Sequence, residues 1–74
     1  MHSTVSVYRD GKPVEGKKVT ISISGILSGG HASGITDRSG CATISHASEG
    51  SAKVFVNGRE VGHFHVPGRT SVDL

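Results

Sequence analysis

Apolar residues recur at every second position along much of this chain, and this pattern restricts the possible folds more than any other feature. The stretch 50–66 shows it best, because the alternation continues on both sides of Asn57-Gly58, a dipeptide that favours tight turns. A period of two is typical of strands with one buried face, since successive side chains point to opposite sides of a sheet. The sequence therefore predicts a β-hairpin over residues 50–66.

The length of the hairpin loop decides which side chains are buried, because a shift of one residue moves every side chain to the other face. A two-residue turn at Asn57-Gly58 would place His63 and His65 among the buried valines. A type I turn followed by Gly58 in the left-handed region as a bulge avoids this burial, so we expect an odd-length loop. The buried face is then predicted to hold Ala52, Val54, Val56, Gly62, Phe64 and Val66, and the outer face Lys53, Phe55, Val61, His63 and His65.

Shorter alternating segments predict further strands. They cover residues 4–8, residues 18–24, a short segment after Gly40, and residues 70–74. No segment has the spacing of three and four that an amphipathic helix needs, so the chain is predicted to be all-β. The side chains expected to point inward are Val5, Val7, Val14, Val19, Ile21, Ile23, Ala42, Ile44, Val72 and Leu74.

Glycine and aspartate mark the connections between these strands. Asp10-Gly11 ends the first strand, and the glycine-rich segment 25–34 is predicted to be a mobile crossing from one sheet to the other. No helix follows that segment, so it does not have the pattern of a phosphate-binding loop. Asp37 and Gly40 occupy the first and last positions of a predicted type I turn, in which the Asp37 carboxylate accepts hydrogen bonds from the turn's own amides.

Composition restricts the classes of function. A chain of 74 residues has room for one domain, so residues 1–74 are treated as a single β-sandwich domain. The formal charge of +2 comes from scattered lysines and arginines, which does not indicate nucleic-acid binding. Tyr8, Phe55 and Phe64 are too few aromatic residues for a flat carbohydrate-binding platform.

The sequence leaves the cellular location open. It contains no apolar segment long enough to span a membrane, and its N-terminus lacks the apolar centre of a signal peptide. A complete chain of this kind would be cytoplasmic, whereas a fragment of an exported protein would be extracellular or on the cell surface. The single cysteine, Cys41, cannot form an internal disulfide, so the fold does not depend on an oxidising compartment.

Four segments occur in an order that resembles known families: DGKPVEG at residues 10–16, KVTISI at 18–23, TDRSGCATI at 36–44 and GSAKVFV at 50–56. In this order they resemble bacterial immunoglobulin-like domains of the invasin and intimin type. They are equally similar to carboxypeptidase regulatory-like, transthyretin-like sandwiches. The resemblance implies a small antiparallel β-sandwich, here of about six or seven strands, used as a spacer, stalk or adhesive module without catalysis.

Two histidines form the one group that could carry metal chemistry. His63 and His65 are alternate residues of a predicted strand, so both rings point the same way and can offer nitrogens to one ion. Two ligands are too few for a structural zinc site. A third would have to come from His31, His46, Glu60 or another chain, and none has a diagnostic spacing. A small histidine-dependent metal-binding domain therefore remains the alternative prediction.

The main functional prediction is a non-catalytic structural or protein-interaction module without a cofactor. Phe55 and Val61, flanked by Lys53, are the predicted partner-binding residues, since an exposed apolar pair can form the centre of a protein contact. Edge strands also present unpaired backbone groups, so the module is expected to bind a protein partner or itself through an edge strand or the outer hairpin face. An enzyme is not predicted, because the carboxylates lie mostly in or beside turns and no serine lies in a nucleophile-elbow pattern.

Overall fold

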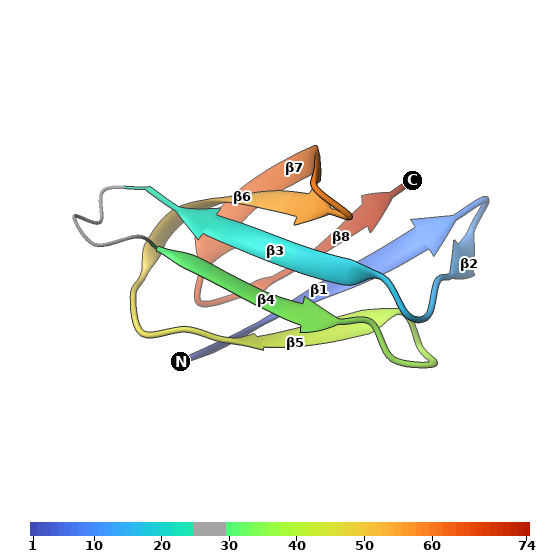
Figure 1. The fold of residues 1–74 in the computed structure, drawn as a ribbon, viewed down its shortest axis with the longest axis horizontal. Helices are drawn as coiled ribbons and strands as arrows, with labels where there is room; N and C mark the ends of the chain where they lie inside the picture. The colour runs from blue at the N-terminus through green and yellow to red at the C-terminus, as the bar shows by residue number, and fades with distance from the viewer. Residues whose placement is uncertain (25–29) are drawn as a thin grey trace.

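The computed structural model describes residues 1–24 and 30–74, and in these residues the chain forms strands and turns without a helix (Figure 1). The all-β prediction is therefore confirmed for the described residues. The strands are β1 (His2–Arg9), β2 (Lys12–Pro13), β3 (Lys18–Ile23), β4 (His31–Ile35), β5 (Cys41–Ser45), β6 (Gly50–Val56), β7 (Arg59–Val66) and β8 (Arg69–Asp73).

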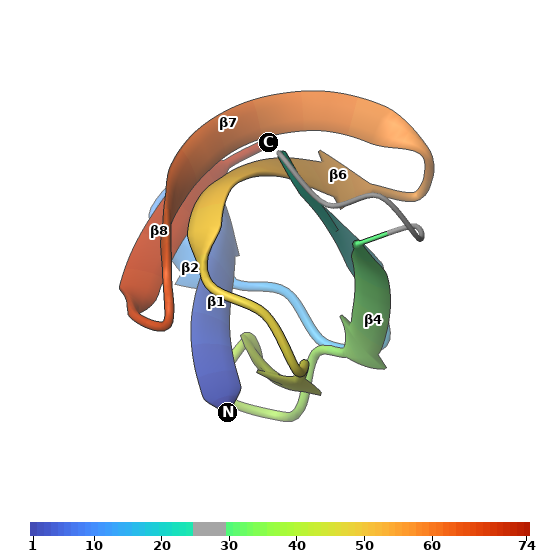
Figure 2. The same ribbon diagram turned by 90° about the vertical axis from the view of Figure 1, so that its left-hand side faces the viewer.

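The strands form two sheets that enclose a common interior, an arrangement consistent with a small β-sandwich (Figure 2). One sheet has the order β4-β3-β6-β7 and is antiparallel throughout. In the other sheet β1 is central, with β5 and the short β2 antiparallel to it and β8 parallel to it. The parallel β1–β8 pair departs from the predicted antiparallel arrangement, and β2 and β4 are strands that the sequence did not predict.

Aliphatic side chains fill the space between the sheets. The core comprises Val5, Val7, Val19, Ile21, Ile23, Ala42, Ile44, Ala52, Val54, Val56, Val66 and Val72. Val14 and Phe64 are partly buried and pack against this core, as predicted. The prediction for Leu74 is wrong, because this residue lies past the end of β8 and is 39% exposed.

The hairpin of β6 and β7 closes through a two-residue turn, so the predicted odd-length loop is wrong. Val56 lies opposite Arg59, and the φ angles of Asn57 and Gly58 are 53° and 84°. Positive φ at both central positions is the property of a type I′ turn, whose twist matches that of the paired strands. Asparagine and glycine adopt this conformation at lower cost than other residues, so the dipeptide itself favours the turn.

The extra residue of the hairpin is Val61, in a β-bulge within β7. Phe55 pairs with Glu60 and Val54 pairs with Gly62, so Val61 has no opposite residue on β6. A bulge of this kind adds one residue to one strand and reverses the alternation that follows it. It therefore has the same effect on register as the odd-length loop predicted from the sequence.

The bulge accounts for the faces of β7. Beyond it Val66 is buried, while His63 and His65 are exposed, as predicted. Val61 itself is half-buried and packs against the core, so its predicted outward position is wrong. The physical reason is that a bulged residue has no residue opposite it, so its side chain does not follow the alternation and can point toward the interior.

The predicted sheet crossing over 25–34 is wrong where the structure describes it. Residues 31–35 form β4, which is antiparallel to β3 and remains in the same sheet, with His31 opposite Ser22. Residues 25–29 of that prediction lie outside the described residues. The chain changes sheet after β4 instead, because β5 pairs with β1 in the other sheet.

The turn between β4 and β5 has the predicted aspartate chemistry. The Asp37 Oδ1 atom accepts hydrogen bonds from the backbone N–H groups of Ser39 at 2.9 Å and Cys41 at 3.0 Å. The Gly40 N–H donates to the Asp37 carbonyl oxygen at 2.9 Å, and Gly40 has a φ of 79°. Asp37 therefore accepts hydrogen bonds from two amides at the turn where the chain passes from one sheet to the other.

Candidate functional site

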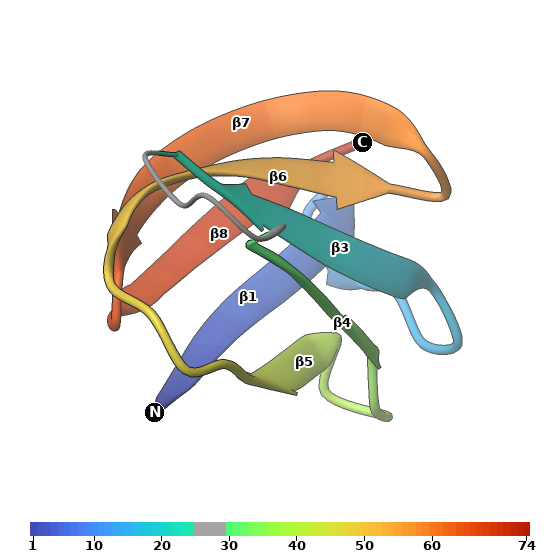
Figure 3. The ribbon, with the colours of Figure 1, turned by 60° about the vertical axis from the view of Figure 1, so that its left-hand side comes forward.

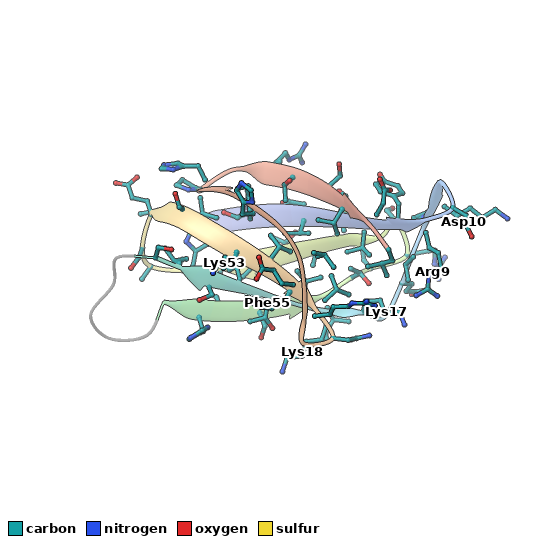
Figure 4. All side chains as sticks on the ribbon, turned by 90° about the horizontal axis from the view of Figure 1, so that it is seen from above. Arg9, Asp10, Lys17, Lys18, Lys53 and Phe55 are labelled. Atoms are coloured by element: carbon teal, nitrogen blue, oxygen red, sulfur yellow. The ribbon has the colours of Figure 1, made fainter. Side chains whose placement is uncertain are left out.

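Two of the predicted partner-binding residues, Phe55 and Lys53, lie side by side on the outer face of the sheet β4-β3-β6-β7 (Figure 4). They are alternate residues of β6, where the intervening Val54 points into the core. The register places Thr20 of β3 opposite Phe55 and Ser22 opposite Lys53. Directly opposite residues have Cβ atoms about 4.5–5.5 Å apart, so these side chains share one surface.

The neighbouring strands complete a polar surround for the Phe55 ring. On β7, Glu60 lies opposite Phe55 and His63 lies opposite Lys53. Phe55 is half-buried, whereas Lys53, Glu60 and His63 are exposed. We define the Phe55 face as the group Lys18, Thr20, Ser22, Lys53, Phe55, Glu60 and His63. An aromatic centre with a polar rim is the arrangement found at protein contacts.

The structure separates Val61 from the other two predicted partner-binding residues. Val61 packs against the core and lines a depression at one end of the molecule instead of the Phe55 face. The apolar pair expected from the sequence is therefore reduced to the Phe55 ring. Sequence reasoning missed this because a bulge at Val61 and an odd-length loop produce the same apolar pattern beyond them.

The two histidines of the metal-binding alternative do lie on one side of β7. His63 and His65 are both exposed, and the residue opposite His63 is the cationic Lys53. His31 lies in the same cross-strand row but three strands away, a separation of about 14 Å at the usual strand spacing. Within residues 1–24 and 30–74, no three His, Cys, Asp or Glu side chains come together as a metal site.

His46, another proposed third ligand, is engaged elsewhere. Its ring is buried, with the Nε2 atom 2.7 Å from the Ser3 Oγ atom and the Nδ1 atom 2.7 Å from the Ser48 carbonyl oxygen. A serine beside a histidine is the arrangement of an activated nucleophile, but Ser3 is only 1% exposed. The contact therefore joins structural elements and does not present a reactive group to solvent.

An open depression of about 540 Å³ lies at the end of the molecule where the β6–β7 turn approaches the ends of β1 and β8. Two basic side chains, Arg9 and Arg59, line it together with one acidic residue, Asp73. The remaining lining residues are Val56, Asn57, Val61 and Leu74. Sequence reasoning did not find this site because its residues come from strands that are distant along the chain.

Comparison with known proteins finds no matching family model and no matching curated relative. In the described ranges, the structure has no apolar helix of the length needed to cross a bilayer.

Proposed function

We propose that this chain is a non-catalytic interaction module that binds a protein partner through the Phe55 face. One observation carries the proposal: the half-buried Phe55 ring lies on β6, one of the two middle strands, where its neighbours on β3 and β7 are polar, and the exposed Ile35 of the edge strand β4 is a second apolar side chain on the same sheet face. Aromatic anchors surrounded by polar residues contribute most of the binding free energy at many protein interfaces. A rigid sheet holds such an anchor at low entropic cost, because β3 and β7 pair with β6 on both sides.

The charge around Phe55 favours a partner with an acidic rim. Lys53 lies two residues before Phe55 on the same side of β6, and Lys18 lies diagonally across from Phe55 on β3 (Figure 4). Diagonal neighbours in a sheet lie about 7–8 Å apart, and alternate residues of one strand lie about 6–7 Å apart, so both lysine side chains are long enough to reach the edge of a contact centred on the ring. Glu60 is the one carboxylate of the Phe55 face, which leaves an excess of positive charge there. We therefore propose an apolar pocket bordered by carboxylates as the complementary surface.

The non-catalytic part of the proposal is supported by how the polar side chains are used. Among the described residues, every buried side-chain nitrogen or oxygen atom has a hydrogen-bond partner within the protein. The Ser3 and His46 pair, which has the composition of a nucleophile and its base, is enclosed. We further propose that the sandwich is of the immunoglobulin-like or transthyretin-like kind, on the basis of the sequence resemblance.

The test compares the substitutions Phe55→Ser and Tyr8→Ser. Tyr8 is the matched control because it is a half-buried aromatic residue of β1, in the opposite sheet. A partner isolated with the native protein is purified and its affinity is measured for each variant. We expect Phe55→Ser to weaken binding at least about tenfold, equivalent to about 1.4 kcal/mol, and Tyr8→Ser to leave the affinity unchanged.

Two results would contradict the proposal. One is a partner whose affinity falls with Tyr8→Ser and not with Phe55→Ser, which would move the contact to the other sheet. The other is a protein that remains monomeric in light scattering and yields no partner dependent on Phe55. Urea unfolding of both variants provides the folding control.

A further inference from the structure

The strands β7 and β8 have adjacent open edges. They are consecutive strands joined at Pro67-Gly68, and they separate as they leave this connection (Figures 1 and 3). β7 pairs with β6 in one sheet and β8 pairs with β1 in the other, and the described pairing includes no ladder between β7 and β8. We call the boundary between the unpaired edges of β7 and β8 the seam, and it separates the two sheets on this side of the molecule.

The pairing of β8 with β1 shows which backbone groups face the seam. The Thr4 N–H donates to the Gly68 carbonyl oxygen at 3.0 Å, and the Leu74 N–H donates to the Tyr8 carbonyl oxygen at 2.7 Å. In a parallel pair, alternate residues of a strand bond to the same neighbour, so the even-numbered residues of this segment face β1. The N–H and C=O groups of Arg69, Ser71 and Asp73 consequently point away from β1, and all three residues are exposed.

The depression described above lies at the wide end of this seam. Arg59 and Val61 come from the first half of β7, while Asp73 ends β8. Arg9, at the end of β1, adds a second guanidinium group (Figure 4). Among the side chains of the lining, two guanidinium groups face one carboxylate, which gives these side chains a net positive charge, and Val61 supplies an apolar wall. This chemistry suits a ligand that carries both a carboxylate and an aliphatic side chain.

We propose that the free edge of β8 binds an extended acidic peptide as an additional strand. The peptide backbone pairs with Ser71 and Asp73, a carboxylate of the peptide lies between Arg9 and Arg59, and an aliphatic side chain two residues away packs on Val61. Residues two apart point the same way in a strand, so one peptide can satisfy both requirements. The inference rests on the proposed role as a protein-binding module, but it assigns a second surface and a partner class.

The experiment selects random octapeptides displayed on phage against the immobilised native protein. We expect the selected peptides to carry Asp or Glu two residues from Val, Ile or Leu. A synthetic peptide of the selected sequence should bind at least about tenfold more weakly to the variants Arg9→Ala and Arg59→Ala. Arg38→Ala is the matched control, because Arg38 is exposed in the turn after β4, and its affinity should be unchanged.

Two further measurements separate strand addition from other binding modes. Methylation of alternate peptide nitrogens should abolish binding, because it removes the donors that pair with the β8 edge. In amide NMR spectra, the peptide should shift the signals of Ser71 and Asp73 and leave those of Thr20 and Phe55 unchanged. Urea unfolding of the arginine variants should match that of the native protein, which excludes loss of fold as the cause.

Several outcomes would overturn the inference. These are the absence of selected peptides, selected peptides without an acidic residue, and undiminished binding of the methylated peptide. Shifts confined to Thr20 and Phe55 would also overturn it, but they would support the proposed function, since the peptide would then occupy the Phe55 face. A dimer that Arg9→Ala dissociates would replace the peptide with a second copy of the chain and would likewise contradict the inference.

Discussion

The Oγ atom of Ser3 lies 2.7 Å from the Nε2 atom of His46, and this buried contact joins the first strand to the segment that follows β5. A carbonyl oxygen only accepts hydrogen bonds, so the Nδ1 atom of His46 donates to Ser48. In the neutral ring, Nε2 then accepts from the Ser3 hydroxyl, whose oxygen accepts from the Gly68 N–H at 3.2 Å. Three segments of the chain thus meet at one serine side chain.

The substitution His46→Ala should lower the free energy of unfolding by about 1–3 kcal/mol, because it leaves the Ser3 hydroxyl and the Ser48 carbonyl without this partner. Urea unfolding monitored by circular dichroism measures the change. His31→Ala is the matched control, since His31 is exposed on β4, and it should change stability by less than about 0.5 kcal/mol. Equal effects of the two substitutions would show that the buried contact adds no stability.

The substitution Gly40→Ala should lower the free energy of unfolding more than alanine at Gly11 or Gly58. A Cβ atom at Gly40 would lie 2.7 Å from the Val7 carbonyl oxygen and 2.9 Å from the Pro13 Cβ atom. The φ of 79° adds backbone strain. We expect a loss of about 3 kcal/mol or more in the free energy of unfolding, measured by urea unfolding.

The control for this prediction is Gly11→Ala. Gly11 has a φ of 78° but has nothing within 4 Å of the added Cβ, so this variant should lose only the backbone cost of about 1–2 kcal/mol. The difference between the two variants isolates the contact with Val7 and Pro13. A difference near zero would mean that the turn moves away from β1 without cost.

Two glycines of the β6–β7 hairpin should respond differently to alanine, because Gly58 has a positive φ in the type I′ turn and Gly62 does not. Gly58→Ala should lower the free energy of unfolding by about 1–2 kcal/mol, because alanine at a φ of 84° is strained. Gly62→Ala should leave stability unchanged or raise it by about 0.5 kcal/mol, since its Cβ would make an ordinary contact with Val72 Cγ1 at 3.5 Å. Thermal unfolding of both variants checks the prediction, and equal losses would contradict the observed turn.

Deletion of Val61 should prevent the protein from folding in water. Without the bulged residue, the alternation of β7 would carry His63 and His65 inward and Val66 outward. The NMR spectrum should then lose the dispersion of a folded sheet. Val61→Ala keeps the residue count and should cost only about 1 kcal/mol, so a folded deletion variant would show that the bulge does not control the register.

The sequence correctly predicted the inward side chains of most strands and the outward position of Phe55. Both predictions depend on a local property, because successive residues of a strand point to opposite faces whichever strand it pairs with. The candidate site was predicted in part, because Phe55 and Lys53 share a face while Val61 does not. The wrong expectation for Val61 has a physical cause, since a bulge and an odd-length loop have the same effect on the apolar pattern beyond them.

The amino-acid sequence by itself determined that the chain forms strands, which of their faces are apolar, and that Asn57-Gly58 and Asp37 lie in turns. Tertiary structure decided the parallel β1–β8 pair, the burial of His46 beside Ser3, and the meeting of Arg9 with Arg59 at one depression. The physical reason is the distance along the chain over which each interaction acts. Turn and strand preferences act between neighbouring residues. Strand pairing, in contrast, brings together residues far apart in sequence, and an alternating strand can pair with more than one partner until packing selects among them.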